Sequence, residues 1–194
     1  GYHKIFSDDA EPVDISESLK HFFAYRYYKN INFFYGDYRF LRAEKKFRNM
    51  TKLDLKHCFE SITPSTLSTA MFNHKMEECE GSLAFDFCKL QDDFNKSRDG
   101  IIIGPEFSRI YAEIILQRID LELEKQLEKE EILRNKDYIF YRYVDDGFFF
   151  FNEIEIKDRF FYTYISELKK YGLRINKEKI VAFSERPFVE SISI

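Results

Sequence analysis

Apolar and polar residues recur along this chain with two periods, and each period predicts one type of element. Short apolar or alternating runs predict strands at 50–55, 137–144, 147–152, 173–176 and 179–184. Apolar residues spaced three or four apart predict helices at 16–30, 63–79, 82–96, 105–131 and 157–171. Thr63-Pro64 is typical of a helix start and Gly172 of a helix end, so two of these boundaries are expected to be sharp.

The order of these elements predicts the architecture. With the inserted helices set aside, the chain runs β, α, β, β, α, β. This is the ferredoxin-like order, in which an antiparallel sheet carries helices on one face, so we expect an α+β fold. In such a sheet the first strand (50–55) lies beside the central hairpin.

Composition is that of a globular domain with a real core. The chain has 194 residues, of which 44% are hydrophobic and 33% charged. No apolar run approaches the roughly 20 residues of a membrane span, so no membrane contact is expected. Three cysteines without metal-ligand spacing predict reduced thiols in a cytoplasmic protein. A net charge of −4 argues only weakly against nucleic-acid binding, because a basic groove can lie on an acidic protein.

The most unusual local feature is an aspartate pair, Asp145 and Asp146, between two apolar runs in "FYRYVDDGFFFF". Adjacent carboxylates in such surroundings lose hydration and repel each other. Asp54 lies in a second apolar strand and has no evident structural role. Because the first strand neighbours the hairpin, we expect all three carboxylates to converge at one end of the sheet. The alternative is a solvated hairpin turn, where aspartate is common for backbone reasons.

Converging carboxylates suggest both a metal and a reaction. Mg²⁺ is a hard cation that binds a few carboxylates together with substrate phosphates. Two such ions a few Å apart can stabilise the attacking and leaving oxygens of an in-line phosphoryl displacement. The three aspartates therefore predict nucleotidyl transfer.

Four segments resemble motifs A to D of reverse transcriptases and occur in the right order. They are "LDLKHCF", "GIIIGPEFSRIYAEI", "YRYVDD" and "LKKYGLRINKEK". "GPEFSRIYAEI" and "RYVDD" are most similar to the bacterial abortive-infection (Abi) and related phage-defence enzymes. The resemblance implies a polymerase right-hand palm over residues 50–189. Residues 1–49 would then be a tail and a short partial fingers region, and residues 190–194 a truncated end.

The resemblance also implies the metal ligands. Asp54 and Asp145 match the carboxylates that bridge two Mg²⁺ ions, for which Mn²⁺ can substitute. Asp146 matches the third and less direct acidic residue. Leu55 would offer its backbone carbonyl to a metal, as the second position of motif A does.

Nucleotide contacts follow from the same resemblance. Phe59 matches an aromatic ring that clashes with a ribose 2′-OH and so selects deoxynucleotides, although an ordinary core aromatic is the alternative. Lys179 matches the motif D lysine, which could protonate or neutralise the leaving pyrophosphate. Lys177 is its near alternative, and a surface lysine without a role is equally compatible with the sequence. Gly100 and Gly104 would let the backbone approach the incoming nucleotide.

Motif B departs from the family pattern, and the role of the basic residues before motif A stays open. Ile102 and Ile103 replace the Pro and Gln of the usual Gly-x-Pro-Gln-Gly core of motif B, which leaves templated and untemplated synthesis both open. A basic set before motif A lies where fingers residues would reach triphosphate or template, or else forms a solvated helix face. Its members are Arg39, Arg42, Lys45 and Lys46.

The sequence thus predicts a reverse-transcriptase-type DNA polymerase of phage defence in the bacterial cytoplasm. Its partners would be dNTPs and a nucleic-acid primer/template or product DNA, with protein priming left open. A non-enzymatic palm that scaffolds an assembly or binds nucleic acid is the main alternative, and a nucleotide cyclase is a weaker one. Fifteen residues follow Lys179, so we expect a C-terminal region in a longer parent chain. That region, or assembly into a homo-oligomer, would then be needed to hold a primer.

Overall fold

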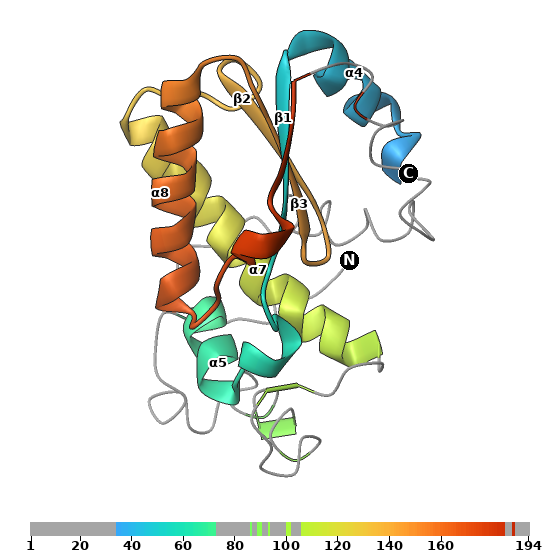
Figure 1. The fold of residues 1–194 in the computed structure, drawn as a ribbon. Helices are drawn as coiled ribbons and strands as arrows, with labels where there is room; N and C mark the ends of the chain where they lie inside the picture. Colours follow the sequence, from blue (N-terminus) through green and yellow to red (C-terminus); the bar gives the residue numbers. More distant parts are fainter. Residues whose placement is uncertain are drawn as a thin grey trace, which may run out of the picture. The chain divides into compact units, whose positions relative to one another are not determined.

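A computed structural model describes residues 34–72, 100–101 and 106–184, together with 86, 89, 90, 93 and 188 (Figure 1). The chain divides into two compact units, Gly1–Arg26 with Phe59–Arg118, and Tyr27–Cys58 with Ile119–Ile194. The described elements are α4 (Tyr38–Lys46), β1 (Asn49–Asp54), η1 (Phe59–Ser61), α5 (Pro64–Phe72), α7 (Glu106–Lys129), β2 (Tyr138–Tyr143), β3 (Asp146–Phe151), α8 (Ile154–Lys170), η3 (Lys177–Lys179) and β4 (Val181–Phe183).

The second unit is built on one four-stranded antiparallel sheet with the strand order β2-β3-β1-β4. This is the order expected of a ferredoxin-like sheet, and it confirms the α+β fold. β1 lies beside the central hairpin, as predicted. The two strands pair from Asn49 opposite Phe151 to Asp54 opposite Asp146.

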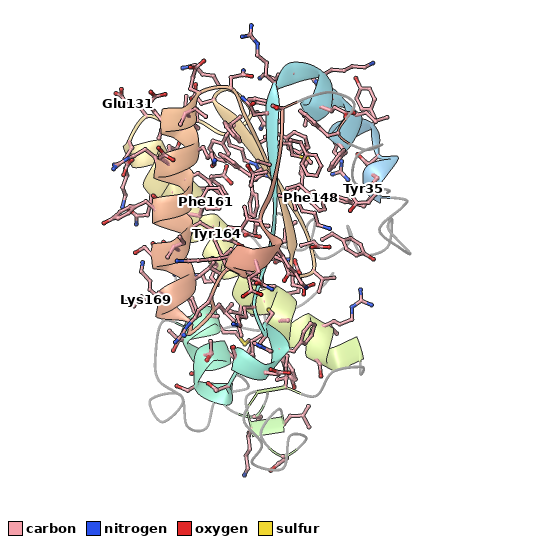
Figure 2. All side chains as sticks on the ribbon, viewed as in Figure 1. Tyr35, Glu131, Phe148, Phe161, Tyr164 and Lys169 are labelled. Carbon is pink, nitrogen blue, oxygen red and sulfur yellow. The ribbon has the colours of Figure 1, made fainter. Side chains whose placement is uncertain are left out.

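One face of the sheet packs against α4 and the residues that precede it. Phe40 of α4 lies edge-on to Phe148 and Phe150 of β3, with ring centroids 5.6 and 5.1 Å apart. Tyr35 completes the contact, 5.6 Å from Phe148, and Figure 2 shows these two rings beside each other. The buried cluster on this face consists of Phe34, Tyr35, Phe40, Ala43, Phe47, Met50, Ile139, Phe148, Phe150 and Phe188.

The opposite face packs against α8. Phe149 of β3 stacks on Phe160 of α8 at 3.8 Å, and Phe140 of β2 lies 5.4 Å from Tyr164. Because both faces are covered, the hairpin carries continuous aromatic runs instead of clean alternation. The sequence predicts helices on one face. α8 occupies that face, and α4, which lies outside the βαββαβ unit, adds a layer on the other.

Helix boundaries follow their local signals. α5 begins at Pro64, as predicted. α8 ends in a Schellman motif, in which Leu173 N–H donates to the Leu168 carbonyl and Gly172 N–H to that of Lys169. Gly172 has φ +71°, which explains the glycine. The predicted helices at 16–30 and 82–96, and the part of 63–79 beyond Phe72, fall outside or largely outside the described residues.

The predicted strand at 173–176 is wrong. Only an isolated antiparallel bridge, between Leu55 and Ile175, forms there. The chain turns immediately afterwards, because the Asn176 side chain accepts a hydrogen bond from Glu178 N–H and caps η3. The last predicted strand shortens accordingly to the three residues of β4.

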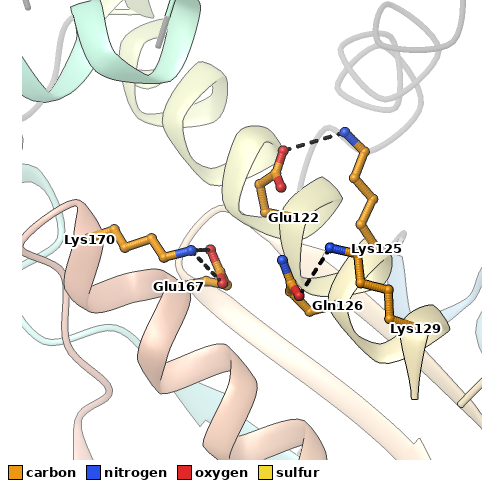
Figure 3. A network of polar contacts seen from close by, with 6 residues as sticks. All are labelled: Glu122, Lys125, Gln126, Lys129, Glu167 and Lys170. Atoms are coloured by element: carbon orange, nitrogen blue, oxygen red, sulfur yellow. Dashed lines mark hydrogen bonds and ion pairs between the residues drawn. The ribbon is translucent and has the colours of Figure 1, made fainter. Parts of the chain in front are cut away.

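Ion pairs and hydrogen bonds between side chains lie on the helix surfaces. Figure 3 shows Lys125 with Glu122 on α7, and Lys170 bonded to both oxygens of Glu167 on α8. A solvent-accessible pair such as Lys125–Glu122 contributes about 0–1 kcal/mol, whereas Glu167 is buried. No helix in the described ranges is both long and apolar enough to cross a membrane.

Gly147 is the point where the sheet tolerates no side chain. A Cβ there would lie 2.7 Å from Leu53 Cδ1 and 2.9 Å from Phe140 Cε2, and both side chains are buried. We predict that Gly147→Ala lowers stability by about 1–3 kcal/mol, or roughly 2–12 °C in Tm by calorimetry. Gly172→Asn is the control, because its surroundings are open and asparagine tolerates positive φ. An unchanged Tm for Gly147→Ala would contradict the packing described.

Candidate functional site

The three aspartates meet at one end of the sheet. Asp54 is the last residue of β1 and Asp146 the first of β3, and the two are direct partners in the ladder. Asp145 lies in the two-residue turn that joins β2 to β3, directly before Asp146. Asp54 is only 8% exposed, and Asp145 and Asp146 are partly buried. Asp145 thus lies in the hairpin turn, as the alternative expects, but the three carboxylates are not fully exposed to solvent.

Side-chain alternation determines the face on which the carboxylates lie. In a strand, every second side chain points to the same side of the sheet. Asp54 shares its side with Met50, and Asp146 shares its side with Phe148, both of which belong to the cluster against α4. The Asp54 and Asp146 side chains therefore project from the α4 face, opposite to α8.

The turn that carries Asp145 is strained. Val144, its first residue, has φ +56°, whereas the sequence offers no glycine at this position. A β-branched residue in this left-handed region is an outlier, and such conformations cost about 1–3 kcal/mol. Two-residue hairpin turns with positive φ at the first position normally carry glycine there. The surrounding structure must therefore hold this turn in place.

Asp54 has two partners from the segment after α8. Lys179 Nζ lies 3.2 Å from Asp54 Oδ2, and Asn176 Nδ2 donates to the same oxygen at 3.4 Å. Asn176 N–H also donates to the Asp54 carbonyl at 2.8 Å. The structure thus brings Lys179, a predicted site residue, to the carboxylates. Asn176 is a contact that sequence reasoning missed.

Lys52 is a second residue that sequence reasoning missed. Its Nζ lies 3.5 Å from Asp146 Oδ2 and 5.7 Å from the centre of the Phe148 ring. The signal was present, because Lys52 lies two residues before Asp54 in an apolar strand and so shares its face. Two of the three aspartates are therefore each paired with one lysine, Asp54 with Lys179 and Asp146 with Lys52.

Burial and mutual repulsion shape the electrostatics of the site. Burial is the main cause that raises the pKa of both Asp145 and Asp146, and the negative charge of Asp54 adds to it. Lys52 opposes the shift at Asp146, and Lys179 opposes it at Asp145. Burial, with the Asp146 charge, also raises the pKa of Tyr35 to about 12. The hydrogen bond to Asp54 raises the pKa of Lys179, which stays cationic at neutral pH.

The donor chemistry fits a hard divalent cation. Three partly desolvated carboxylates repel one another, and a cation among them would relieve that repulsion. The isolated β-bridge between Leu55 and Ile175 is formed by backbone hydrogen bonds of Asp54 and Lys56. The Leu55 carbonyl is therefore not used in this bridge. As the side chains lie, however, the described residues contain no group of three or more His, Cys, Asp or Glu that could hold a metal ion. Lysines engage two of the carboxylates instead.

The remaining predicted residues lie elsewhere. Phe59 begins η1 in the first unit, is half-buried, and accepts a backbone hydrogen bond from Ile101 at 2.8 Å. Gly104 falls outside the described residues. Gly100 has a structural reason to be glycine, because its φ is +80° and a Cβ would lie 2.3 Å from the Glu60 carbonyl oxygen.

The basic set of α4 lies on the exposed side of that helix. Arg39 pairs with Asp37 at 3.1 Å, and Lys46 donates to the backbone carbonyl of Asn135. All four members, Arg39, Arg42, Lys45 and Lys46, are exposed, which agrees with a solvated helix face. A role in binding triphosphate or template stays a prediction.

Comparison with known proteins adds a family. Residues 4–190 match the family model described as reverse transcriptase (RNA-dependent DNA polymerase). No curated protein sequence matches the chain. The fold is similar to that of apo telomerase from Candida tropicalis, with a TM-score of 0.55 and 19% identity over 76% of this chain and 32% of that one.

Other telomerase structures have similar TM-scores and sequence identities to this chain. A Candida tropicalis telomerase truncated from its C-terminal domain has a TM-score of 0.53 and 23% identity, over 71% of this chain and 31% of that one. Telomerase from Candida albicans in complex with a TWJ fragment of telomeric RNA has a TM-score of 0.51 and 15% identity, over 92% and 38%. The chain therefore spans about a third of the length of these neighbours, and at such identities the likeness concerns the fold.

The raised pKa of Asp145 leads to a prediction about stability. A carboxyl with a higher pKa in the folded state ionises there at a cost, so its contribution to stability falls as pH rises through that pKa. Asp145→Asn removes this cost, so its Tm in chelator-containing buffer at pH 7 is expected to exceed that of wild type.

Calorimetry across pH measures the difference between the two proteins. The gain should shrink as pH is lowered toward the ordinary aspartate range, because the wild-type carboxyl then becomes neutral too. Each kcal/mol corresponds to about 2–4 °C for a chain of this size. A large loss of Tm in Asp145→Asn, or a gain that does not vary with pH, would indicate a structural role for the carboxylate.

Proposed function

The chain belongs to the reverse transcriptase family, and from this premise we propose that it is a nucleotidyltransferase that adds deoxynucleotides to a DNA strand. One observation carries the proposal: Asp54 lies directly opposite Asp146 in the sheet, with Asp145 in the adjoining turn. Three partly buried carboxylates lie here against two lysine partners, so their negative charge is only partly offset. A site that binds cations and phosphates explains why they are there.

Each residue of the site has a proposed role. Asp54 and Asp145 would hold two Mg²⁺ ions, or Mn²⁺ in their place, together with the Leu55 carbonyl. Such ions stabilise the charge on the attacking and leaving oxygens of phosphoryl transfer. Asp146, which is paired with Lys52, would interact with the metal ions less directly.

Lys179 is the proposed partner of the leaving pyrophosphate. Its side chain is 65% exposed and is held by a single carboxylate oxygen, so the ammonium can move to a phosphate that enters the site. Its raised pKa keeps it protonated at neutral pH. It can therefore neutralise the leaving group or donate a proton to it.

Two finer features of the function rest on the sequence. Similarity of "GPEFSRIYAEI" and "RYVDD" to bacterial Abi enzymes supports a role in phage defence in the bacterial cytoplasm. The telomerase bound to telomeric RNA supports a nucleic-acid partner for this fold. Because Ile102 and Ile103 replace the Pro and Gln of motif B, the proposal includes synthesis without a template. Priming by a protein and assembly into a homo-oligomer are further, separate parts of the proposal.

Incorporation of labelled dNTPs in the presence of Mg²⁺, with and without added primer–template, tests the activity. We predict that Asp145→Asn reduces incorporation by more than about a hundredfold while the chain stays folded, because the amide keeps the shape but loses the charge. Asp158→Asn is the matched control, since Asp158 is an exposed carboxylate on α8.

Near wild-type incorporation by Asp145→Asn would refute the assignment of the site. A wild-type chain that binds nucleic acid but incorporates no nucleotide under any primer condition would favour the scaffold alternative.

Sugar selection gives a second prediction. If the Phe59 ring lies under the sugar, Phe59→Ala should lower the preference for dNTPs over ribonucleotides, measured as the ratio of kcat/KM values, by about tenfold or more. Phe161→Ala on α8 is the control, because this half-buried ring packs near Phe149 at 6.3 Å. An unchanged ratio with activity retained would show that Phe59 serves only packing.

A further inference from the structure

The strained turn at Val144 is held from behind by Arg142. Arg142 Nη1 donates to the Val144 carbonyl oxygen at 2.8 Å. Its Nε donates to Asp120 Oδ2 on α7 at 2.9 Å. The Arg142 side chain is only 6% exposed and that of Asp120 29%, so the guanidinium itself is shielded from water. One guanidinium therefore connects the tip of the hairpin to a helix.

The Arg142 side chain lies on the face of the sheet opposite to the Asp54 and Asp146 carboxylates. Arg142 shares its side of β2 with Phe140, which packs against Tyr164 and Phe160 on the α8 face. Asp146 projects from the other face. Arg142 can therefore brace the turn without occupying the space that a substrate would need.

The contact acts on the peptide group next to Asp145. The Val144 carbonyl and the Asp145 nitrogen form one planar peptide group. A hydrogen bond that fixes the Val144 oxygen therefore also fixes the orientation of the backbone at Asp145. A bond from a guanidinium is charge-assisted and directional. Valine does not favour positive φ by itself, so the turn depends on such an external contact.

We propose that Arg142 is a positioning residue that holds the Val144-Asp145 turn in its positive-φ conformation and so sets the direction of the Asp145 carboxylate. The proposal deepens the proposed function and rests on it. Asp120 anchors the guanidinium, and together the two residues link α7 to the catalytic turn.

The test replaces both members of the ion pair, buried Arg142 and partly exposed Asp120, with apolar residues. Asp120→Leu combined with Arg142→Met removes both charges, and replacing an ion pair with apolar residues is often neutral for stability. Arg142→Lys is the second variant, because lysine keeps the charge but not the planar two-way geometry. Tyr164→Phe is the matched control, since the buried Tyr164 hydroxyl has no hydrogen-bond partner in the described structure.

Two readouts separate positioning from simple loss of fold. We expect the paired variant to keep its KM for dNTP within about twofold while kcat falls about tenfold or more, because small misplacements of a reacting group are costly. Hydrogen exchange of the amides at 144–147 should speed up about tenfold in the paired variant and less in Arg142→Lys. Tyr164→Phe should change neither readout.

Val144→Gly supplies the decisive comparison. Glycine adopts positive φ without strain, so in a Val144→Gly background the loss of kcat caused by the paired variant should shrink to about threefold or less. An equal loss in both backgrounds, or unchanged exchange at 144–147 in the paired variant, would overturn the proposal. If the wild-type chain incorporates no nucleotide, the proposed function fails, and hydrogen exchange still decides whether Arg142 holds the turn.

Discussion

The antiparallel register between β1 and β3 places Asp54 opposite Asp146, and the rest of the site depends on this pairing. Side chains alternate between the faces of a strand, so a slip of one residue would turn Asp54 toward α8. Burial on both faces opposes such a slip. Phe148 and Phe150 fill the cluster against α4, while Phe149 stacks on Phe160, so every aromatic residue of the run has only one suitable side.

Placing three carboxylates together creates an electrostatic problem that the chain solves with lysines. Lys179 neutralises Asp54, and Lys52 neutralises Asp146. Both ammonium groups come from neighbouring positions in the sheet or its connections, and both are more mobile than a backbone donor. The two lysines offset only part of the negative charge of the three aspartates, and a divalent cation with its phosphates would compete with these lysines for the same oxygens.

Much of this site could be predicted from the sequence, because charges within apolar strands are a strong signal and the order of the elements determines which strands are neighbours. That reasoning brought Asp54 to the hairpin. It did not reveal Lys52 or Asn176, since their contacts depend on the exact register and on a capped turn. It also predicted a strand at 173–176 that is only a bridge, because a short apolar pattern does not distinguish the two. The roles of Phe59 and Gly104 remain predictions.

The central claim is that these carboxylates form one cation site, and paramagnetic broadening by Mn²⁺ tests it directly. In an NMR titration of the wild-type chain, the amide signals of residues 54–55 and 145–147 should broaden first. Asp54→Asn should shift this effect to much higher Mn²⁺ concentrations, because one bridging ligand has lost its charge. Broadening that begins elsewhere, such as at the acidic end of α7, or that is unchanged by Asp54→Asn, would contradict the account.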